Sequence, residues 1–348
     1  QYYTMKISVC FIMRDEEKNA FRVLSEVKKF ADEIIVVDTG SNDKTKEIAG
    51  KFTNYVYNYV WHNNFSEARN YAFSLATGDY LAWFDADDDI PESTIAAINE
   101  LKKRPLADVY YLKYEYDEIC EKPVLSFYRE RIVKNCAEAK FKGRVHESIA
   151  PFGKIEYLNA SVKHLKKENR GRRNLNIYLE AVKNGEQLTL RDFYYMGKEY
   201  FYNKNYKSAQ KMLKKFILNS KSSLLNVKDA LLTLYKCDEK YNVKYLFKAL
   251  EVFGADAEIV CNVGDYFRKK GDLKSAAAFY ENALKCEMPH FTNDFVYEIY
   301  YNYYPLTWLT NIYYELKQYK QAKLFAEKCI KLFPADELAV KNMSFFIK

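Results

Sequence analysis

No stretch of the sequence approaches the ~18–20 consecutive apolar residues that a membrane-spanning helix requires. The first five residues, Gln1 to Met5, lack the basic region and the apolar core of a secretory signal peptide. Close pairs of cysteine are also missing. The seven Cys are an odd number spread along the chain, so we expect reduced residues that are buried singly. Together these absences predict a cytoplasmic protein without a membrane span.

The composition does not indicate disorder. Apolar residues make up 49% of the chain and aromatic residues 17%, which is typical of a globular protein. A chain of 348 residues is long enough for two domains, each with its own core.

Excess positive charge is scarce outside one short segment. The net charge is +7, and the chain is close to neutral apart from a cluster opposed only by Glu168. The cluster consists of Lys163, Lys166, Lys167, Arg170, Arg172 and Arg173. A nucleic-acid-binding protein would spread its basic residues over a wider face, so we expect no nucleic-acid partner. One compact cluster suits a small anion such as a diphosphate, but it fits the exposed start of a linker helix equally well.

The first half of the chain alternates between strand and helix patterns. Expected strands are 6–13, 33–38, 55–60 and 78–83, and expected helices are 15–30, 45–52 and 66–76. The near-continuous β-branched run at 33–38 is typical of a strand buried on both faces of a parallel sheet. The alternation predicts an α/β fold with a mostly parallel sheet, whose ligands bind at the carboxyl ends of the strands. Arg14-Asp15, Asp38 and Asp85–Asp89 all follow strands, so we expect them to converge on one site.

The most unusual of these segments is Phe84-Asp85-Ala86-Asp87-Asp88-Asp89, with four carboxylates in five residues. Such a cluster persists more easily when a cation shares it, and carboxylate oxygens suit Mg²⁺ or Mn²⁺ held jointly with phosphates. A solvated acidic loop is the alternative. A helix is expected from about Pro91, and we assign its capping to Asp89, which leaves Asp88 as a hydrogen-bond acceptor on the sugar side or as a base.

Four motifs stand in order with helix and strand spacing between them: Ser8-Val9 with Glu16-Glu17, then Val37-Asp38-Thr39-Gly40-Ser41-Asn42-Asp43-Lys44-Thr45, then Ala68-Arg69-Asn70, and then Phe84-Asp85-Ala86-Asp87-Asp88. This order resembles family 2 glycosyltransferases of the GT-A fold over roughly residues 6–170. The resemblance implies that Asp38 binds the base of a nucleoside-diphosphate sugar, usually uracil, and that Arg69 lies on the nucleotide side. It also implies that Asp85 and Asp87 hold ribose and metal–diphosphate, with Asp87 the direct metal ligand.

Several of these residues have simpler interpretations. Asp38 could begin a turn, and Arg69 could be a helix-surface residue paired with Glu67. His164 ends the segment Ala160-Ser161-Val162-Lys163-His164, which we expect to be the last strand of the domain. The resemblance to other GT-A enzymes implies a further metal or diphosphate ligand there, and imidazole suits Mn²⁺ better than Mg²⁺. Arg14 and Arg173 are the further cations expected near the diphosphate.

The segment Phe141-Lys142-Gly143-Arg144-Val145-His146-Glu147 places a His beside a Glu after a Gly turn. Inverting sugar transfer needs a base that takes the proton of the acceptor. A Gly-x-Val-His-Glu segment resembles one in family 2 members that carry helical repeats, on the acceptor side of the site. Glu147 and His146 are both candidates for the base, followed by Asp88. A His held in a turn is the alternative.

Strand patterns disappear after Asn174, and a helical repeat takes their place. The first copy has Phe193, Met196, Gly197, Tyr200, Ala209, Leu213 and Phe216 at the offsets of a tetratricopeptide repeat. The second copy has Val260, Val263, Gly264, Phe267, Ala276, Tyr280 and Ala283, and the third has Leu306, Leu309, Tyr313, Ala322, Ala326 and Cys329. The gap between the first and second copies leaves room for a degenerate unit built on Leu231, Leu232, Tyr235 and Ala249. We expect small residues to let paired helices approach closely, and the Tyr-rich insertion 288–305 to line a groove for peptide.

The predicted organisation is therefore a GT-A domain over residues 1–173 and an all-α tetratricopeptide-like domain over residues 174–348. The predicted function is metal-dependent, inverting transfer of a sugar (glucose or N-acetylglucosamine class) from a UDP-sugar to a Ser, Thr or Cys side chain. The acceptor would be a peptide or protein presented by the repeats, as in bacterial enzymes that glycosylate bacteriocin peptides or flagellin. The alternatives are a carbohydrate or lipid acceptor and a non-catalytic scaffold with a decayed transferase domain. A homodimer is left open as an assembly.

Overall fold

The computed structural model describes residues 4–165, 171–220, 226–238, 240 and 242–346. The chain forms two compact units. The first comprises 1–116 with 127–195, and the second comprises 117–126 with 196–348. The predicted division after residue 173 stays a prediction, although helix α5 (Arg173–Lys183) and the first turns of α6 (Leu190–Tyr202) group with the sheet.

The β-strands and the helices between them cover the first half of the chain. In chain order they are β1 (Ile7–Met13), α1 (Glu17–Val27), β2 (Glu33–Asp38), α2 (Thr45–Ala49), β3 (Val56–Asn58), α3 (Phe65–Ser74), β4 (Tyr80–Trp83), β5 (Asp88–Asp89), α4 (Glu92–Lys103), β6 (Val109–Ile119), β7 (Lys122–Lys134), β8 (Phe141–Lys142), β9 (Ser148–Ile149) and β10 (Ile155–His164).

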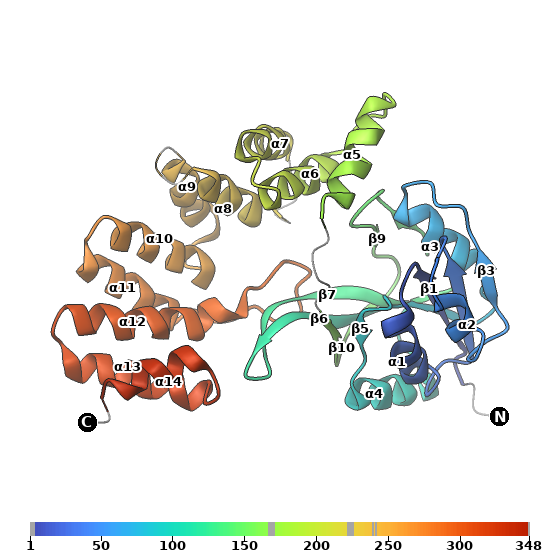
Figure 1. Cartoon of the computed structure of the whole chain (residues 1–348), viewed down its shortest axis with the longest axis horizontal. Coiled ribbons are helices and arrows are strands. Elements are labelled where there is room, and N and C mark those ends of the chain that lie inside the picture. Colours follow the sequence, from blue (N-terminus) through green and yellow to red (C-terminus); the bar gives the residue numbers. More distant parts are fainter. Residues whose placement is uncertain (1–3, 166–170, 221–225, 239, 241, 347–348) are drawn as a thin grey trace. The chain divides into compact units, whose positions relative to one another are not determined.

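The strands form an eight-stranded sheet in the order β3-β2-β1-β4-β7-β6-β10-β5. Strands β3, β2, β1 and β4 are mutually parallel, whereas β7 is antiparallel to β4 and β5 is antiparallel to β10. Helix α3 lies beside β1 and β2 (Figure 1). The predicted mostly parallel α/β sheet is confirmed, because the apolar runs at 7–13 and 33–38 are buried central strands.

The register of these strands brings their carboxyl ends together. Met13 lies opposite Asp38, and Cys10 lies opposite Trp83. The residues that follow β1, β2 and β4 therefore leave the sheet at the same edge. A small antiparallel pair, β8 and β9, is separate from this sheet.

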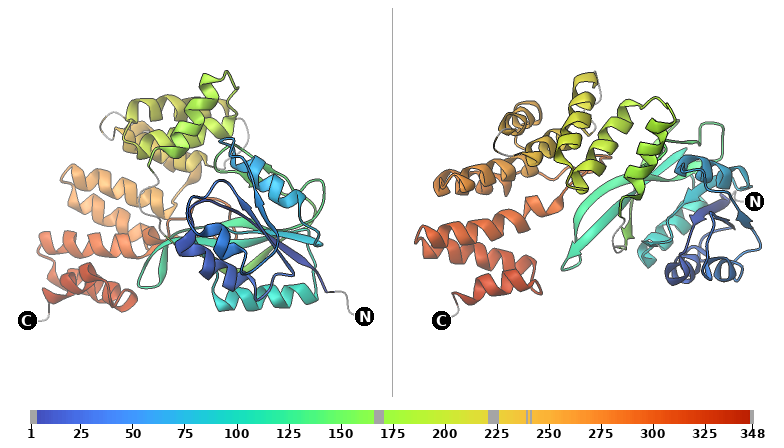
Figure 2. Two further views of the ribbon diagram at one scale, coloured as in Figure 1. Left: turned by 45° about the vertical axis from the view of Figure 1, so that its right-hand side comes forward. Right: turned by 45° about the horizontal axis from the view of Figure 1, so that its top comes forward.

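Helices make up the rest of the chain. They are α5 (Arg173–Lys183), α6 (Leu190–Tyr202), α7 (Tyr206–Asn219), α8 (Val227–Cys237), α9 (Val243–Phe253), α10 (Ala257–Lys269), α11 (Leu273–Ala283), the 3₁₀ helix η1 (Glu298–Tyr301), α12 (Tyr303–Glu315), α13 (Tyr319–Leu332) and α14 (Glu337–Ser344). From α6 onward they pair as hairpins that stack in chain order, coloured from yellow-green to red in Figure 2.

The predicted close approach of paired helices is confirmed at two glycines. A Cβ on Gly197 would lie 2.7 Å from Leu213 Cγ, and one on Gly264 would lie 3.0 Å from a ring carbon of Tyr280. A larger side chain at Gly197 would require Leu213 to move, and one at Gly264 would require a smaller adjustment of the Tyr280 ring. The degenerate unit is also present, with all four of its predicted residues in one buried cluster.

The tyrosines of the insertion and its flank bond within the chain, and their predicted role in lining a groove for peptide stays a prediction. The hydroxyls of Tyr301, Tyr303, Tyr304 and Tyr313 donate to Asp256, Asp336, Asp265 and Glu281 at 3.3, 2.9, 2.7 and 2.6 Å. All four rings are half-buried and pack against the core of the repeats. These tyrosines are therefore bound by the chain itself, because each hydroxyl needs an acceptor once its ring is packed.

The insertion reaches the first helix of three successive hairpins. Burial raises the pKa of the Tyr297 hydroxyl, and the charges acting on it come from Lys198 of α6 and Asp229 of α8. The backbone N–H at the start of α8 donates to Asp294, and the Tyr300 carbonyl accepts a bond from a thiol of α10. The tip of the β6–β7 hairpin, residues 117–126, also contacts the insertion, because Ser126 forms a β-bridge with Val296.

None of the helices that the structure describes is long and apolar enough to cross a bilayer. All seven cysteines are free thiols. Only Cys10, Cys237, Cys261 and Cys329 are fully buried, so the expectation of buried residues is wrong for the other three, which are half-exposed. A cytoplasmic location stays a prediction.

Candidate functional site

The loops after β1 and β2 are locked to each other. Asp15 has a left-handed backbone (φ +53°) and accepts the Asn42 N–H at 2.8 Å, while its own N–H donates to Ser41 Oγ at 3.0 Å. The N–H of Glu17, at the start of α1, donates to Asp43 Oδ2 at 3.0 Å. These reciprocal bonds give a rigid floor at the carboxyl edge of the sheet.

Asp38 ends β2 and is 1% exposed. Its Oδ2 accepts the N–H groups of Gly40 and Ser41 at 3.1 and 3.0 Å, so it does begin a turn. Gly40 has φ +103°, a conformation that favours glycine. Within the described residues, Asp38 Oδ1 is buried without a hydrogen-bond partner. A buried unpaired carboxylate oxygen is costly, so this atom is suited to an N–H donor from a ligand.

Arg69 of α3 is buried and bridges two carboxylates. Its Nη2 lies 2.6 Å from Asp85 Oδ1 and its Nε lies 2.6 Å from Glu147 Oε1. The guanidinium also stacks over Trp83, 4.5 Å from the ring centroid. The interpretation of Arg69 as a surface residue paired with Glu67 is wrong, because the helix face that carries it points into the core.

The charges in this cluster favour an ionised Asp85. Burial alone would raise the pKa of Asp85, but the charges of Arg69 and Arg131 and the bond from Arg69 hold it well below its usual range. Likewise burial would lower the pKa of Arg69, but Asp85 and Glu147 outweigh it and raise that pKa. Asp85 and Arg69 therefore both remain charged at physiological pH.

Asp87 and His164 face each other, with His164 Nδ1 3.8 Å from Asp87 Oδ2. Pairing of β5 with β10 brings them together, since His164 lies opposite Asp88 and the Leu165 N–H donates to the Asp87 carbonyl at 2.8 Å. One ligand atom each from Asp87, Asp88 and His164 lie within 4.8 Å of one another. Oxygen and imidazole donors at this spacing fit a divalent ion such as Mn²⁺.

Asp88 is fully buried. Its Oδ2 lies 3.1 Å from Arg131 Nη1 and accepts the Asp85 N–H at 2.9 Å, while its Oδ1 accepts the Tyr114 hydroxyl at 2.5 Å. Burial and the charge of Asp85, against the pull of Arg131, raise the pKa of Asp88 to about 6. This geometry favours a role in holding the Asp85 loop; the predicted sugar-side role stays a prediction.

The prediction that Asp89 caps the helix after Pro91 is wrong. Pro91 itself is the N-cap residue of α4, and no side chain caps that helix. Asp89 belongs to the short strand β5 and lies 3.6 Å from Arg22 Nη1. Pairing with β10 therefore decides the position of Asp89.

His146 and Glu147 lie in the connection between β8 and β9. His146 has φ +54° and its ring stacks on Tyr195, with centroids 4.3 Å apart and planes at 13°. The Glu147 carboxylate is committed to Arg69, and its carbonyl accepts from Arg129 Nη2 at 2.9 Å. The prediction that the two lie at one edge of the site agrees with this placement.

A cavity of about 600 Å³ collects most of the predicted residues. Of these, Arg14, Arg69, Asp85, Asp87, His146, Glu147, His164 and Arg173 line it, and Asp38 and Asp88 do not. Arg14 and Arg173 are exposed, and Arg173 lies over the Phe65 ring at 5.1 Å. Lys166, Lys167 and Arg170 of the basic cluster lie outside the described residues.

Three residues of the site were not predicted from the sequence. Arg131 and Tyr114 hold Asp88, and Arg129 holds the Glu147 carbonyl. The run Arg129-Glu130-Arg131 inside the otherwise apolar end of β7 was an available signal, because charged residues are rarely buried without partners.

The family comparisons agree with this architecture. The model described as Glycosyl transferase family 2 matches residues 8–129, and the model described as Tetratricopeptide repeat matches residues 257–285 and 306–336. The first predicted copy, at 193–216, corresponds to the hairpin of α6 and α7.

Similar proteins carry names from both classes. A TPR repeat-containing protein of Synechococcus elongatus is 31% identical over 144 residues, which are 41% of this chain and 35% of that protein. The glycosyltransferase SunS of Bacillus subtilis is 27% identical over 235 residues, which are 63% of this chain and 54% of SunS. The cholesterol galactosyltransferase of Borreliella burgdorferi is 24% identical over 166 residues, 45% of each chain.

This chain thus spans between a third and a little over half of the relatives that it matches. The family matches agree with the fold, since one covers most of the sheet with the cavity at its carboxyl edge and the other covers two of the stacked hairpins. The chain contains a family 2 glycosyltransferase domain of the GT-A type, followed by tetratricopeptide repeats.

Proposed function

We propose that this protein transfers a sugar from a UDP-sugar to a polypeptide side chain, with inversion at the anomeric carbon and with the help of a divalent metal ion. The observation that carries the proposal is the cavity at the carboxyl edge of the sheet. Residues predicted from four separate parts of the sequence line it together: Arg14, Arg69, Asp85 with Asp87, and His146 with Glu147.

The nucleotide would bind next to β2. Asp38 Oδ1 is buried without a partner within the described residues, and it would accept the imide N–H of uracil. The diphosphate would lie beside Arg14 and Arg173, the exposed cations of the lining. Asp87 and His164 would hold the metal ion, which offsets the negative charge on the departing diphosphate when bound.

We propose His146 as the base. Glu147 accepts a 2.6 Å bond from a buried guanidinium, and both Asp88 oxygens are engaged within the core, so these carboxylates have structural partners already. His146 would take the proton from the acceptor hydroxyl or thiol as its oxygen or sulfur attacks the anomeric carbon. The bond from that carbon to the diphosphate breaks on the opposite side, and UDP leaves with the electron pair.

The repeats support a polypeptide acceptor, because stacked helical hairpins provide extended binding surfaces. The name of the Borreliella burgdorferi relative supplies the competing outcome, a sterol acceptor. The sugar carried by the proposed donor belongs to the glucose or N-acetylglucosamine class.

Thermal shift with UDP, GDP and their sugars, with and without Mn²⁺, tests the donor. UDP with Mn²⁺ should raise the melting temperature most, because the ligand binds only the folded state. Turnover is then measured with unstructured polypeptides rich in Ser, Thr and Cys and with cholesterol in micelles. NMR of the product gives the linkage: an α-linked product from an α-linked donor refutes inversion, and transfer to cholesterol alone refutes the polypeptide acceptor.

A further inference from the structure

Every carbonyl from Gly143 to Glu147 accepts a hydrogen bond from a different residue. Ser66 Oγ donates to the Gly143 carbonyl and the Phe65 N–H to the Arg144 carbonyl at 2.9 Å, both from α3. The remaining donors are the Tyr178 hydroxyl to Val145 at 3.4 Å, Arg191 Nη2 to His146 at 2.8 Å and Arg129 Nη2 to Glu147 at 2.9 Å. The segment that carries His146 is therefore fixed residue by residue from α3, α5, α6 and β7.

Two residues of α6 act on His146 itself. Tyr195 lies face to face with the imidazole. The Arg191 guanidinium lies over the same Tyr195 ring, 4.8 Å from its centroid, and also donates to the His146 carbonyl. Arg191 and Tyr195 are four positions apart, about one helical turn, so both side chains project on the same side of α6.

We propose that Arg191 and Tyr195 are positioning residues for the transfer reaction: they hold His146 in its left-handed conformation with its ring at the wall of the donor cavity. A non-glycine residue with φ near +54° is strained and keeps that conformation only when its surroundings impose it. The hydrogen bond from Arg191 to the His146 carbonyl fixes the His146 backbone, and stacking on Tyr195 fixes the imidazole ring. The inference rests on the proposed function only for the role of His146 as base.

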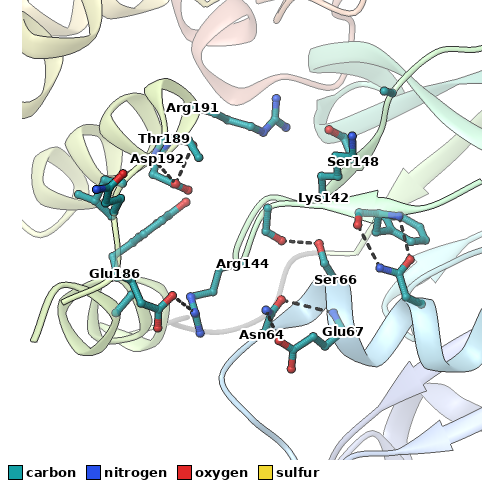
Figure 3. Close-up of a pocket in the computed structure, with 18 residues that line it drawn as sticks. Asn64, Ser66, Glu67, Lys142, Arg144, Ser148, Glu186, Thr189, Arg191 and Asp192 are labelled. Atoms are coloured by element: carbon teal, nitrogen blue, oxygen red, sulfur yellow. Dashed lines mark hydrogen bonds and ion pairs between the residues drawn. The ribbon is translucent and has the colours of Figure 1, made fainter. Parts of the chain in front are cut away.

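A second cavity, of about 580 Å³, lies beside this segment, and its lining includes residues of the β8–β9 connection, of α5 and of the start of α6. Figure 3 shows the Arg144–Glu186 ion pair and the bonds of Thr189 to Asp192 at the start of α6. Ser66 lines the same cavity (Figure 3), and its hydroxyl donates to the Gly143 carbonyl. The Arg144–Glu186 ion pair therefore joins the β8–β9 connection to the segment that precedes α6, the helix that carries Arg191 and Tyr195.

The test uses four variants of the full chain: Tyr195→Leu, Tyr195→Phe, Arg191→Met and, as a matched control, Lys183→Met on the exposed face of α5. The first readout is the NMR signal of the His146 ring, identified among the four histidines by its loss in His146→Gln. The second readout is kcat with the KM for the donor. The NMR readout does not depend on catalysis, so it separates this inference from the proposed function.

In the wild type the His146 ring protons should lie upfield, because they sit over the Tyr195 ring. Tyr195→Leu should remove that shift and lower kcat by about 10- to 100-fold, with the donor KM unchanged, because misplacement of a catalytic group by about 1 Å is enough for such a loss. Tyr195→Phe should keep both the upfield shift and the wild-type kcat, because it retains the stacked ring. Arg191→Met should lower kcat as Tyr195→Leu does, and Lys183→Met should match the wild type.

A His146 signal that stays in place in Tyr195→Leu overturns the inference, and so does a moved signal with unchanged kcat. Equal losses of kcat and of donor affinity would indicate general destabilisation and would overturn it as well. If Tyr195→Leu does not fold, Arg191→Met against Arg191→Lys carries the same comparison. A wild type that binds no UDP-sugar refutes the proposed function, while the NMR comparison still decides on the stacking.

Discussion

Both units bury charged side chains, but they do so for different partners. In the first unit Asp85, Asp87 and Arg69 line a cavity, and Asp38 keeps one buried oxygen without a partner within the described residues. In the second unit Lys198 is buried against Asp229 and Thr233 at 2.7 and 3.1 Å. Tyr301 and Tyr304 of the insertion 288–305 donate to two other carboxylates of the same unit, Asp256 and Asp265.

The difference shows how a buried polar cluster can be interpreted. A cluster whose groups pair with one another inside the core stabilises or specifies a fold, whereas a cluster that lines a cavity is available to a ligand. Burial and charge alone do not separate the two cases. The following changes test the distinction, beginning with the largest expected effect.

Asp87→Ala should abolish turnover and remove most of the Mn²⁺-dependent stabilisation by UDP. Asp87 is one of the two groups proposed to hold the ion, and loss of charge stabilisation at a leaving group costs at least about 10²–10³-fold in kcat. Turnover assays and thermal shift measure the two effects. Glu100→Ala, an exposed carboxylate of α4, is the control. Full activity in a folded Asp87→Ala protein would contradict the metal assignment.

Arg69→Met should lower the free energy of unfolding by about 3–5 kcal/mol, because it leaves the buried Glu147 and the partly exposed Asp85 without their shared cation. Urea denaturation measures the change, with Arg104→Met on the surface as the matched control. A loss no larger than that of the control would show that the two carboxylates are solvated and that the bridge is not structural.

Asp38→Ala should raise the KM for the UDP-sugar by an amount equivalent to about 1–3 kcal/mol and leave the metal dependence in place. The mutation removes the acceptor proposed for uracil while Asp87 and His164 remain. Steady-state kinetics over a range of donor and Mn²⁺ concentrations give both values. Stronger stabilisation of the wild type by GDP than by UDP would refute the assignment of the base.

Tyr304→Phe should cost only about 1 kcal/mol of stability and leave donor binding unchanged, because it removes one hydrogen bond to Asp265 inside the second unit. Tyr314→Phe, on an exposed ring, should cost nothing measurable. Urea denaturation of the Tyr304→Phe and Tyr314→Phe variants measures both changes in stability. If both variants bind the acceptor less tightly at unchanged stability, the tyrosines face a partner after all.

Local patterns were sufficient to predict strands β1 to β4, the helix pairs of the repeats and several charged residues of the cavity lining, but the long strands β6 and β7 were not predicted. The apolar runs at 7–13 and 33–38 and the Gly197 and Gly264 positions report burial directly, and parallel topology then dictates which edge carries the site. Helical repeat offsets likewise located the hairpins.

Contacts between distant segments could not be predicted in the same way. Asp89 was expected to cap a helix, yet its pairing with Lys163 places it in a strand, and only the folded sheet brings these two residues together. Arg191 and Tyr195 match the pattern of an ordinary repeat helix, and nothing local indicates that they reach His146. An isolated catalytic domain should accordingly retain residues through Tyr195, beyond the predicted boundary at residue 173.

The insertion between α11 and α12 has a consequence for how the repeats meet a partner. Because the segment is joined to the stack at both ends, it faces the repeat helices at an effective concentration of the order of millimolar, as short tethers do. A free polypeptide that used the same surface of α8 and α10 would have to outcompete that tethered segment. Its apparent affinity there would fall by the fraction of time for which the surface is uncovered. Partners that add contacts elsewhere, and so arrive as multivalent ligands, would be favoured over short peptides.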